Sequence, residues 1–380
     1  MRLAPARLEQ WYRDHPPDTL VDLSSSGVAP YSFAELRRLA GFEQEELDAL
    51  VLGDSTSLGG AGIRRALADR FAGGDASRVM ATSGSNEAIF LLLSTLLEPG
   101  DEVVVLEPAY HTLASVPALA GARLRTIPLG GEGAFVVDID LLCEAVAGGA
   151  RAVVVNFPHN PTGVTLSAEE ERRLVDAVED AGAYLVWDAA FAELTHDGPP
   201  LPDPAVLSPN SLSVGTLSKA YGLPGLRVGW CVGPPDLLTA TIGLHDATTL
   251  FLSPLVEALA ERVLDNAERF LRPRFAAARR NLQLLEQWVA EHPELVRWTA
   301  PRGGVCAFPF LPLVDDVESF CRRIAVEAGV LLVPGTAFGR PGHVRLGFGG
   351  LEKEFEEGLD RLADALVGLP GSSRRHPTRA

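Results

Sequence analysis

Lysine is rare in this chain, and one of its two lysines lies among residues that could assist its chemistry. Of the 33 Lys and Arg residues, only Lys219 and Lys353 are lysines. Unlike Arg, Lys can lose its proton and form a Schiff base with a carbonyl group. Lys353 lies between two glutamates, which is typical of a solvated helix face. Lys219 follows an apolar run and lies among small residues and glycines, so it is the candidate nucleophile.

Two side chains near Lys219 predict what this lysine binds. Thr216 precedes it by three residues and Arg227 follows it by eight. A hydroxyl and a guanidinium can converge on one phosphate group. A Schiff-base lysine beside a phosphate site is what pyridoxal 5′-phosphate requires of a protein. A surface lysine in a glycine-rich loop is the alternative interpretation of an isolated Lys.

Residues 213–230 resemble the lysine motif of fold-type I pyridoxal phosphate enzymes, the aminotransferase class I/II family. The lysine, the hydroxyl, the glycines at 222 and 225 and the arginine keep the family spacing. The resemblance implies that Lys219 carries the cofactor and that Thr216 and Arg227 hold its phosphate. It also implies an α/β fold with a large domain, in which helices cover a mostly parallel seven-stranded sheet, and a small α+β domain.

The order of apolar segments also predicts an α/β fold. From Val79 onwards, short apolar runs alternate with helical stretches, which is the signature of a parallel sheet with crossover helices. Strands are expected at 79–82, 102–107, 123–127, 151–157, 183–188, 211–216 and 227–232, and helices near 86–97, 111–120, 138–147 and 168–181. Ligands of such folds bind at the carboxyl ends of the strands.

The chain is expected to divide into four parts. These are an N-terminal segment contributing to the small domain (1–48), a large cofactor-binding domain (49–270), a small C-terminal domain (271–367) and a disordered tail (368–380). Further helices are expected over 253–270 and 276–290, the second linking the two domains. The tail is rich in Pro, Ser and Arg, which is typical of disorder.

Composition and charge exclude several classes of protein. The chain has 380 residues, of which 47% are hydrophobic and 22% charged, as in a folded globular protein. A net charge of −17 argues against binding to nucleic acid or an anionic membrane. The four cysteines have neither paired nor metal-site spacing, and no apolar run has membrane-spanning length. We therefore expect a cytoplasmic enzyme without a metal site.

The first two strand ends carry residues that match cofactor sites of the family. Gly84 and Ser85 open a helix, where backbone amides and a hydroxyl can bind an anion, although helix capping explains them as well. The resemblance assigns both to the cofactor phosphate. Tyr110 follows the next strand, where the family has an aromatic residue stacked on the cofactor ring. Core packing is the alternative role for this Tyr.

Two later strand ends match the family in the same way. Asn160 belongs to an Asn-Pro-Thr-Gly segment, either an ordinary turn or the family motif whose Asn donates to the cofactor's phenolic oxygen and adjoins the substrate carboxylate. Asp188 ends an apolar strand, where an unpaired buried charge would be costly. The protonated pyridine nitrogen of the cofactor would be its partner, and the charged ring could then accept electrons from the substrate.

Gly27 and Arg345 are the candidates for binding the substrate carboxylate. Arg345 lies between apolar residues on an expected strand, and a guanidinium can bind a carboxylate through two parallel hydrogen bonds. A surface ion pair is the alternative. Gly27 matches a family glycine whose backbone approaches the same carboxylate, and a plain turn is the alternative there.

Two positions depart from a typical aminotransferase. Phe191 stands where the family usually has a Tyr that hydrogen-bonds the phenolic oxygen. Asp54 stands where the neighbouring subunit usually contributes a Tyr to the phosphate. A carboxylate would repel a phosphate, so Asp54 is expected either to face a cationic substrate group or to cap a helix. Because the family builds its sites at a dimer interface, we expect a homodimer, with Thr248 and Thr249 near the partner's phosphate.

Segments 22–28, 54–60 and 187–191 look like those of capreomycidine synthases. These pyridoxal phosphate enzymes of viomycin- and streptothricin-type antibiotic pathways are similar to aminotransferases but cyclise 3-hydroxyarginine with loss of water. The resemblance implies an amino-acid substrate with a guanidino group, for which Asp54, Ser25 and Ser57 are candidate partners. The alternatives are an ordinary aminotransferase, an arginine oxidase of the same fold and a cofactor-sensing regulator, against which the acidic charge argues.

Overall fold

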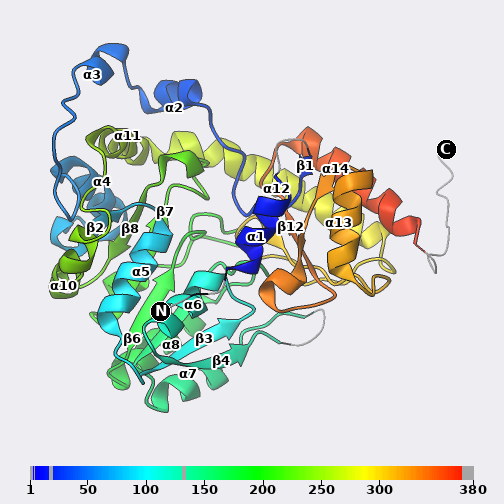
Figure 1. Ribbon diagram of the computed structural model, residues 1–380, viewed down its shortest axis with the longest axis horizontal. Coiled ribbons are helices and arrows are strands. Elements are labelled where there is room, and N and C mark those ends of the chain that lie inside the picture. The colour runs from blue at the N-terminus through cyan, green and yellow to red at the C-terminus, as the bar shows by residue number, and fades with distance from the viewer. Residues whose placement is uncertain (1–2, 4, 17–19, 131–133, 370–380) are drawn as a thin grey trace.

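The computed structural model describes residues 3, 5–16, 20–130 and 134–369, and most of the tail expected at 368–380 lies outside this range. Its main sheet has seven strands in the order β2-β8-β7-β6-β5-β3-β4 (Figure 1). Only β8 runs antiparallel to its neighbours. The strands are β2 (Val79–Thr82), β3 (Glu102–Glu107), β4 (Arg123–Pro128), β5 (Ala152–Asn156), β6 (Tyr184–Asp188), β7 (Ser211–Thr216) and β8 (Gly229–Val232). The predicted mostly parallel seven-stranded sheet is confirmed.

Helices cover both faces of this sheet, which explains why its strands are apolar without alternation. On β3, Val103 and Val105 pack in one buried cluster while Val104 and Leu106 pack in another. Side chains of a strand point alternately to opposite faces, so both faces here are buried. The helices of this part are α4 (Ala61–Phe71), η2 (Ala76–Arg78), α5 (Ser85–Leu96), α6 (His111–Leu119), α7 (Ile139–Ala147), α8 (Ala168–Asp180), α9 (Pro204–Leu207), η3 (Pro224–Leu226), α10 (Pro235–Asp246) and α11 (Pro254–Asp265).

Two small sheets lie beyond the main sheet and bring the two ends of the chain together. β1 (Val21–Asp22) pairs in parallel with β10 (Val330–Leu331), and β12 (Val344–Gly347) lies between β11 (Val333–Pro334) and β9 (Cys306–Ala307). The other elements are α1 (Arg7–Asp14), α2 (Phe33–Ala40), α3 (Gln44–Asp48), α12 (Ala267–Glu291), α13 (Val317–Glu327), η4 (Gly335–Phe338) and α14 (Glu352–Val367). The boundaries predicted for the domains stay predictions.

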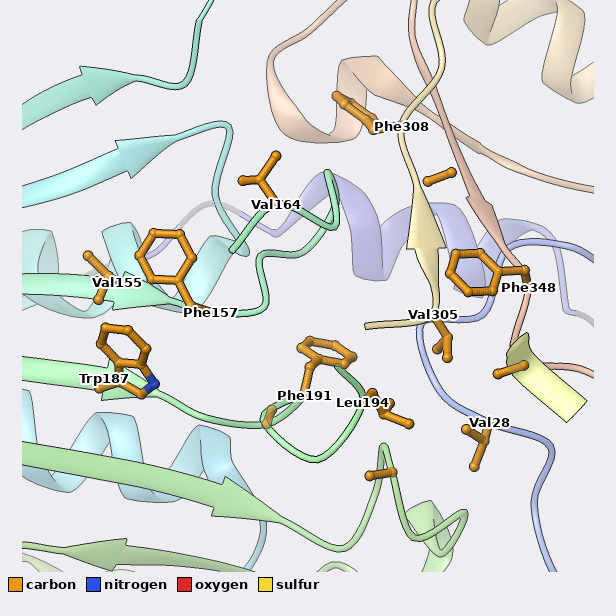
Figure 2. Close-up of a cluster of buried hydrophobic side chains, with 14 of the residues drawn as sticks. Val28, Val155, Phe157, Val164, Trp187, Phe191, Leu194, Val305, Phe308 and Phe348 are labelled. Carbon is orange, nitrogen blue, oxygen red and sulfur yellow. The ribbon is translucent and has the colours of Figure 1, made fainter. Parts of the chain in front are cut away.

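One buried apolar cluster connects the small sheets to the strand ends of the main sheet. Figure 2 shows it running from Phe157 and Trp187 past Phe191 to Val305 and Phe348. Each of these five side chains is at most 3% exposed. The polar residues at the strand ends therefore lie beside a continuous apolar wall.

Several element ends differ from the predicted ones, and α12 begins at Ala267 rather than at residue 276. The helix expected over 253–270 is two helices, because Asn266 leaves helical geometry and its Nδ2 donates to the carbonyl oxygen of Arg262 at 3.0 Å. Such a local side-chain bond competes with the helix ladder. β8 begins at Gly229 rather than at residue 227, since Arg227 has a left-handed backbone with φ 55°. No helix among the described residues is long and apolar enough to cross a membrane.

Alanine substitutions at two glycines are expected to change the free energy of unfolding in opposite directions. Gly215 on β7 lies opposite Trp230 on β8, and a Cβ there would lie 2.3 Å from the indole ring. We expect Gly215→Ala to lower the free energy of unfolding by about 1–3 kcal/mol. Gly243 is exposed inside α10 with nothing within 4 Å of a Cβ, so Gly243→Ala is expected to raise it by about 1 kcal/mol. Urea unfolding of both variants checks this, and equal effects would contradict the packing argument.

Candidate active site

A cavity of about 160 Å³ lies at the carboxyl ends of the main-sheet strands. Of the residues predicted for the site, seven line it together: Ser85, Tyr110, Asn160, Asp188, Thr216, Lys219 and Arg227. A larger cavity of about 300 Å³ touches the same strands but shares only Ala190 and Thr216 with the first. The smaller cavity therefore holds the candidate chemistry.

Lys219 is a partly buried amine and Lys353 an exposed one. The Lys219 Nζ donates a hydrogen bond to Ser26 Oγ at 2.9 Å and lies 5.8 Å from the centre of the Phe191 ring. Burial, together with the charge of Arg345, lowers the pKa of Lys219 to about 8. More of this amine is therefore uncharged near neutral pH than of an ordinary lysine, and the uncharged form is the one that a nucleophile or base requires.

Asp188 is a buried carboxyl whose charge lacks a salt-bridge partner in the described part of the chain. It is 5% exposed, and burial raises its pKa to about 6. The Ala190 amide donates to Asp188 Oδ1 at 3.0 Å, and the Asn156 amide group donates to the backbone oxygen of Asp188 at 2.8 Å. A cationic ring nitrogen would stabilise this carboxylate, so the environment fits pyridoxal phosphate.

The first turn of α5 and Arg227 form an anion cradle. Gly84 is the N-cap of α5, where unpaired backbone amides favour an anion. A Cβ on Gly84 would lie 2.5 Å from Arg227 Nη2, so glycine is needed for this close approach. Ser218, which the sequence reasoning missed, places its Oγ 3.4 Å from Arg227 Nη1. Thr216 Oγ1 lies 2.9 Å from the Val228 oxygen and accepts from the Ser218 amide at 3.1 Å, which closes the turn.

Arg345 lies at the side of the cavity that the N-terminal segment covers. It is 1% exposed, and its Nη1 donates to Asn160 Oδ1 at 3.2 Å. Its Nε and Nη2 donate to the Ser24 carbonyl oxygen at 3.2 and 2.9 Å, and Nη2 also donates to Tyr12 at 2.6 Å. The sequence reasoning missed Tyr12, since α1 looked like an ordinary short helix.

Gly27 and Ser25 lie beside the lysine segment, but like Arg345 and Asp54 they are not among the residues that line the cavity. A Cβ on Gly27 would lie 3.3 Å from the Ser218 carbonyl oxygen, and the Gly27 amide donates to Ser25 Oγ at 3.2 Å. Asp54 is exposed between α3 and α4. Thr249 donates to Glu87 of its own chain, at the start of α5. The roles assigned to Gly27, Ser25 and Asp54 stay predictions.

Tyr110 provides an aromatic wall at the mouth of the cavity. Its hydroxyl accepts a hydrogen bond from Asn86 Nδ2 at 3.3 Å and lies 3.4 Å from Glu9 Oε1. Burial raises the pKa of Tyr110 to about 12, so this hydroxyl stays protonated. Phe191 also lines the cavity near Lys219 and brings no hydroxyl to the site.

The chain is similar to several known proteins along most of its length. Residues 56–362 match the family described as aminotransferase class I and II. The chain is 44% identical over 378 residues to the capreomycidine synthase of Streptomyces vinaceus, which covers 99% of this chain and 97% of that protein. It is 30% identical to the arginine–pyruvate transaminase AruH of Pseudomonas aeruginosa over 79% of this chain and 77% of that protein. The crystal structure of the PLP-dependent cyclase OrfR in complex with Au has a TM-score of 0.92 at 51% identity, covering 96% of this chain and 98% of that one.

The anion cradle can be tested with two glycine variants. In Gly84→Ala the added methyl displaces the Arg227 guanidinium, so we expect pyridoxal phosphate to bind about 10- to 100-fold more weakly. Gly149→Ala is the matched control, since Gly149 also has a positive φ of 98° but has nothing within 4 Å of a Cβ. Equilibrium dialysis measures both dissociation constants. Equal losses of affinity in the two variants would reject the cradle.

Proposed function

This chain belongs to the aminotransferase class I and II family, and we propose that it is a cyclase of the capreomycidine synthase type that acts on 3-hydroxyarginine in the cytoplasm. The predicted family is confirmed, as are the fold and the cofactor, pyridoxal 5′-phosphate. One observation carries the proposal: identity to capreomycidine synthase is 44% over 99% of the chain, against 30% over 79% for the arginine transaminase. We place the reaction in antibiotic biosynthesis.

Different residues of the cavity would hold different parts of the cofactor. Bound pyridoxal phosphate supplies a protonated ring that accepts electrons from the substrate Cα. Asp188 at the end of β6 would hold the ring nitrogen, while the ring would lie against Tyr110 and the phenolic oxygen beside Asn160. The α5 amides with Ser85 and Arg227 would hold the phosphate.

Lys219 would move the proton at the substrate Cα. Its pKa of about 8 leaves part of the amine unprotonated at neutral pH, and its protonated form can return the proton. Ser26 Oγ, at 2.9 Å from Nζ, orients this amine. Arg345 would hold the substrate carboxylate, and Gly27 lets the backbone approach it, which fixes Cα next to Lys219.

In the proposed cyclisation, the bonds broken and the bonds formed balance without an external reactant. The Cβ–O bond breaks, and a guanidine nitrogen of the same molecule forms a bond to Cβ. The hydroxyl leaves with the proton that this nitrogen gives up, and Lys219 returns to Cα the proton that it removed. The net change is the loss of one water. The protein would promote ring closure through a pocket that folds the substrate side chain back towards Cβ. The rate of an intramolecular reaction rises when its two reacting atoms are held close together.

The product distinguishes this cyclase from its rivals. Incubated with 3-hydroxyarginine and no keto acid, the enzyme is expected to form a product lighter by one water, detected by mass spectrometry. An aminotransferase would need a keto acid as amine acceptor, and an oxidase would consume oxygen. Lys219→Arg is the control, since arginine keeps the charge but cannot act as a base. A product that appears only with keto acid, or only with oxygen, would reject the cyclase.

We also propose a homodimer in which Asp54 serves the partner's site. Figure 1 shows α2 and α3 standing away from the main sheet at one end of the molecule. Val51 and Leu52, next to Asp54, are 82% and 71% exposed. Large apolar side chains exposed side by side are typical of a surface that a partner covers. The Asp54 carboxylate would then face the cationic substrate, with Ser25 of the other chain as a further candidate contact.

Mixed dimers test this arrangement. We expect Asp54→Ala homodimers to lose activity on guanidino substrates, and Lys219→Ala homodimers to be inactive. When the two variants are mixed, one site of each heterodimer has an intact Lys219 and receives Asp54 from the other subunit. Activity should therefore recover to a fraction of the wild-type value after the subunits are exchanged. Mixtures that stay inactive while sedimentation shows heterodimers would contradict the proposal.

A further inference from the structure

The short helix α1 carries a carboxylate to the mouth of the cavity that the proposed function does not use. Leu8 and Trp11 bury one side of α1. Tyr12 accepts the hydrogen bond from Arg345. Glu9 precedes Tyr12 by three residues, and residues at this spacing lie on the same face of a helix. Figure 1 shows α1 lying over the region between α6 and β12.

The contacts of Glu9 place its carboxylate at the cavity wall. Its Oε1 lies 3.4 Å from the Tyr110 hydroxyl, which donates to it, and 3.4 Å from His111 Nε2. Tyr110 itself lines the cavity. Both contacts fall on Oε1, and no residue in the described ranges donates a hydrogen bond to Oε2. The Glu9 side chain is 43% exposed, so a ligand at the mouth can reach it.

Glu9 is charged under the conditions in which the enzyme would act. The close contact with the His111 ring lowers the pKa of Glu9, and the charge of Lys219 acts in the same direction. The carboxylate is therefore ionised at neutral pH. Asp188 is the only acidic residue among the described ones that line the cavity itself, and it lies at the strand end where the cofactor would cover it.

We propose that Glu9 of the same chain, in addition to Asp54 of the other chain, binds the guanidinium group of the substrate and thereby selects arginine derivatives over uncharged amino acids. This inference rests on the proposed function, whose substrate it explains. Arg345, which would hold the substrate carboxylate, contacts Tyr12, and Glu9 lies on the same face of α1 one turn before Tyr12. A carboxylate and a guanidinium form charge-assisted hydrogen bonds of matching geometry. Binding next to Tyr110 would also keep the guanidine over the cofactor, close to Cβ.

A pair of near-isosteric ligands tests this role in the holoenzyme. Arginine and citrulline differ mainly in charge, and their dissociation constants follow from the absorbance change of the bound cofactor. We expect Glu9→Gln to weaken arginine binding about tenfold while citrulline binding changes less than about twofold. Asp14→Asn is the matched control, because it removes the same charge from an exposed position of α1 and should change neither constant.

Several outcomes would overturn the proposal. If Glu9→Gln weakened both ligands equally, Glu9 would only fasten α1 through His111, and if it weakened neither, it would not contact the substrate. A wild-type enzyme that bound both ligands equally would reject guanidinium recognition. Because binding needs no turnover, failure to cyclise 3-hydroxyarginine would reject the proposed function and leave this result unchanged.

Discussion

The rest of the site depends on keeping one amine next to a buried guanidinium. Burial and the charge of Arg345 both disfavour the protonated form of Lys219, and they lower its pKa to about 8. Asp188 and Glu9 act in the opposite direction and attract the proton. The amine therefore titrates close to neutral pH, where a group that takes and returns a proton works best. A single exposed lysine such as Lys353 has none of these surroundings.

Residues of the N-terminal segment contact the side chains of the site, in addition to the residues at the strand ends of the main sheet. The strand ends supply the cofactor side, with Asp188, Asn160 and the α5 N-terminus at one edge of the sheet. The N-terminal segment adds the hydroxyl of Ser26 to Lys219 and the carbonyl oxygen of Ser24 to Arg345. Its position is fixed by the pairing of β1 with β10, more than three hundred residues away in the chain. The surroundings of Lys219 and Arg345 thus depend on contacts between segments far apart in the polypeptide.

The structural features that could be predicted from the sequence are those that local sequence patterns encode. The bounds of β2, β3 and β7 were predicted to the residue, since each is a clear apolar run with distinct ends. The cavity residues at the strand ends were predicted because a parallel sheet brings those ends together. Tyr12, Ser26 and Glu9 were missed. Their partners lie 333, 193 and about one hundred positions away, and no local pattern links them.

The guanidinium of Arg345 is already hydrogen-bonded within the chain, and this affects how it could bind an anion. A guanidinium has five N–H groups, and four of those of Arg345 already donate to Ser24, Asn160 and Tyr12. An incoming carboxylate finds one free donor and must displace Asn160 or Tyr12 to form a second bond. Acetate or chloride would exchange one set of bonds for another with little net gain. A larger ligand that contacts both Arg345 and Lys219 would gain an interaction that offsets this exchange.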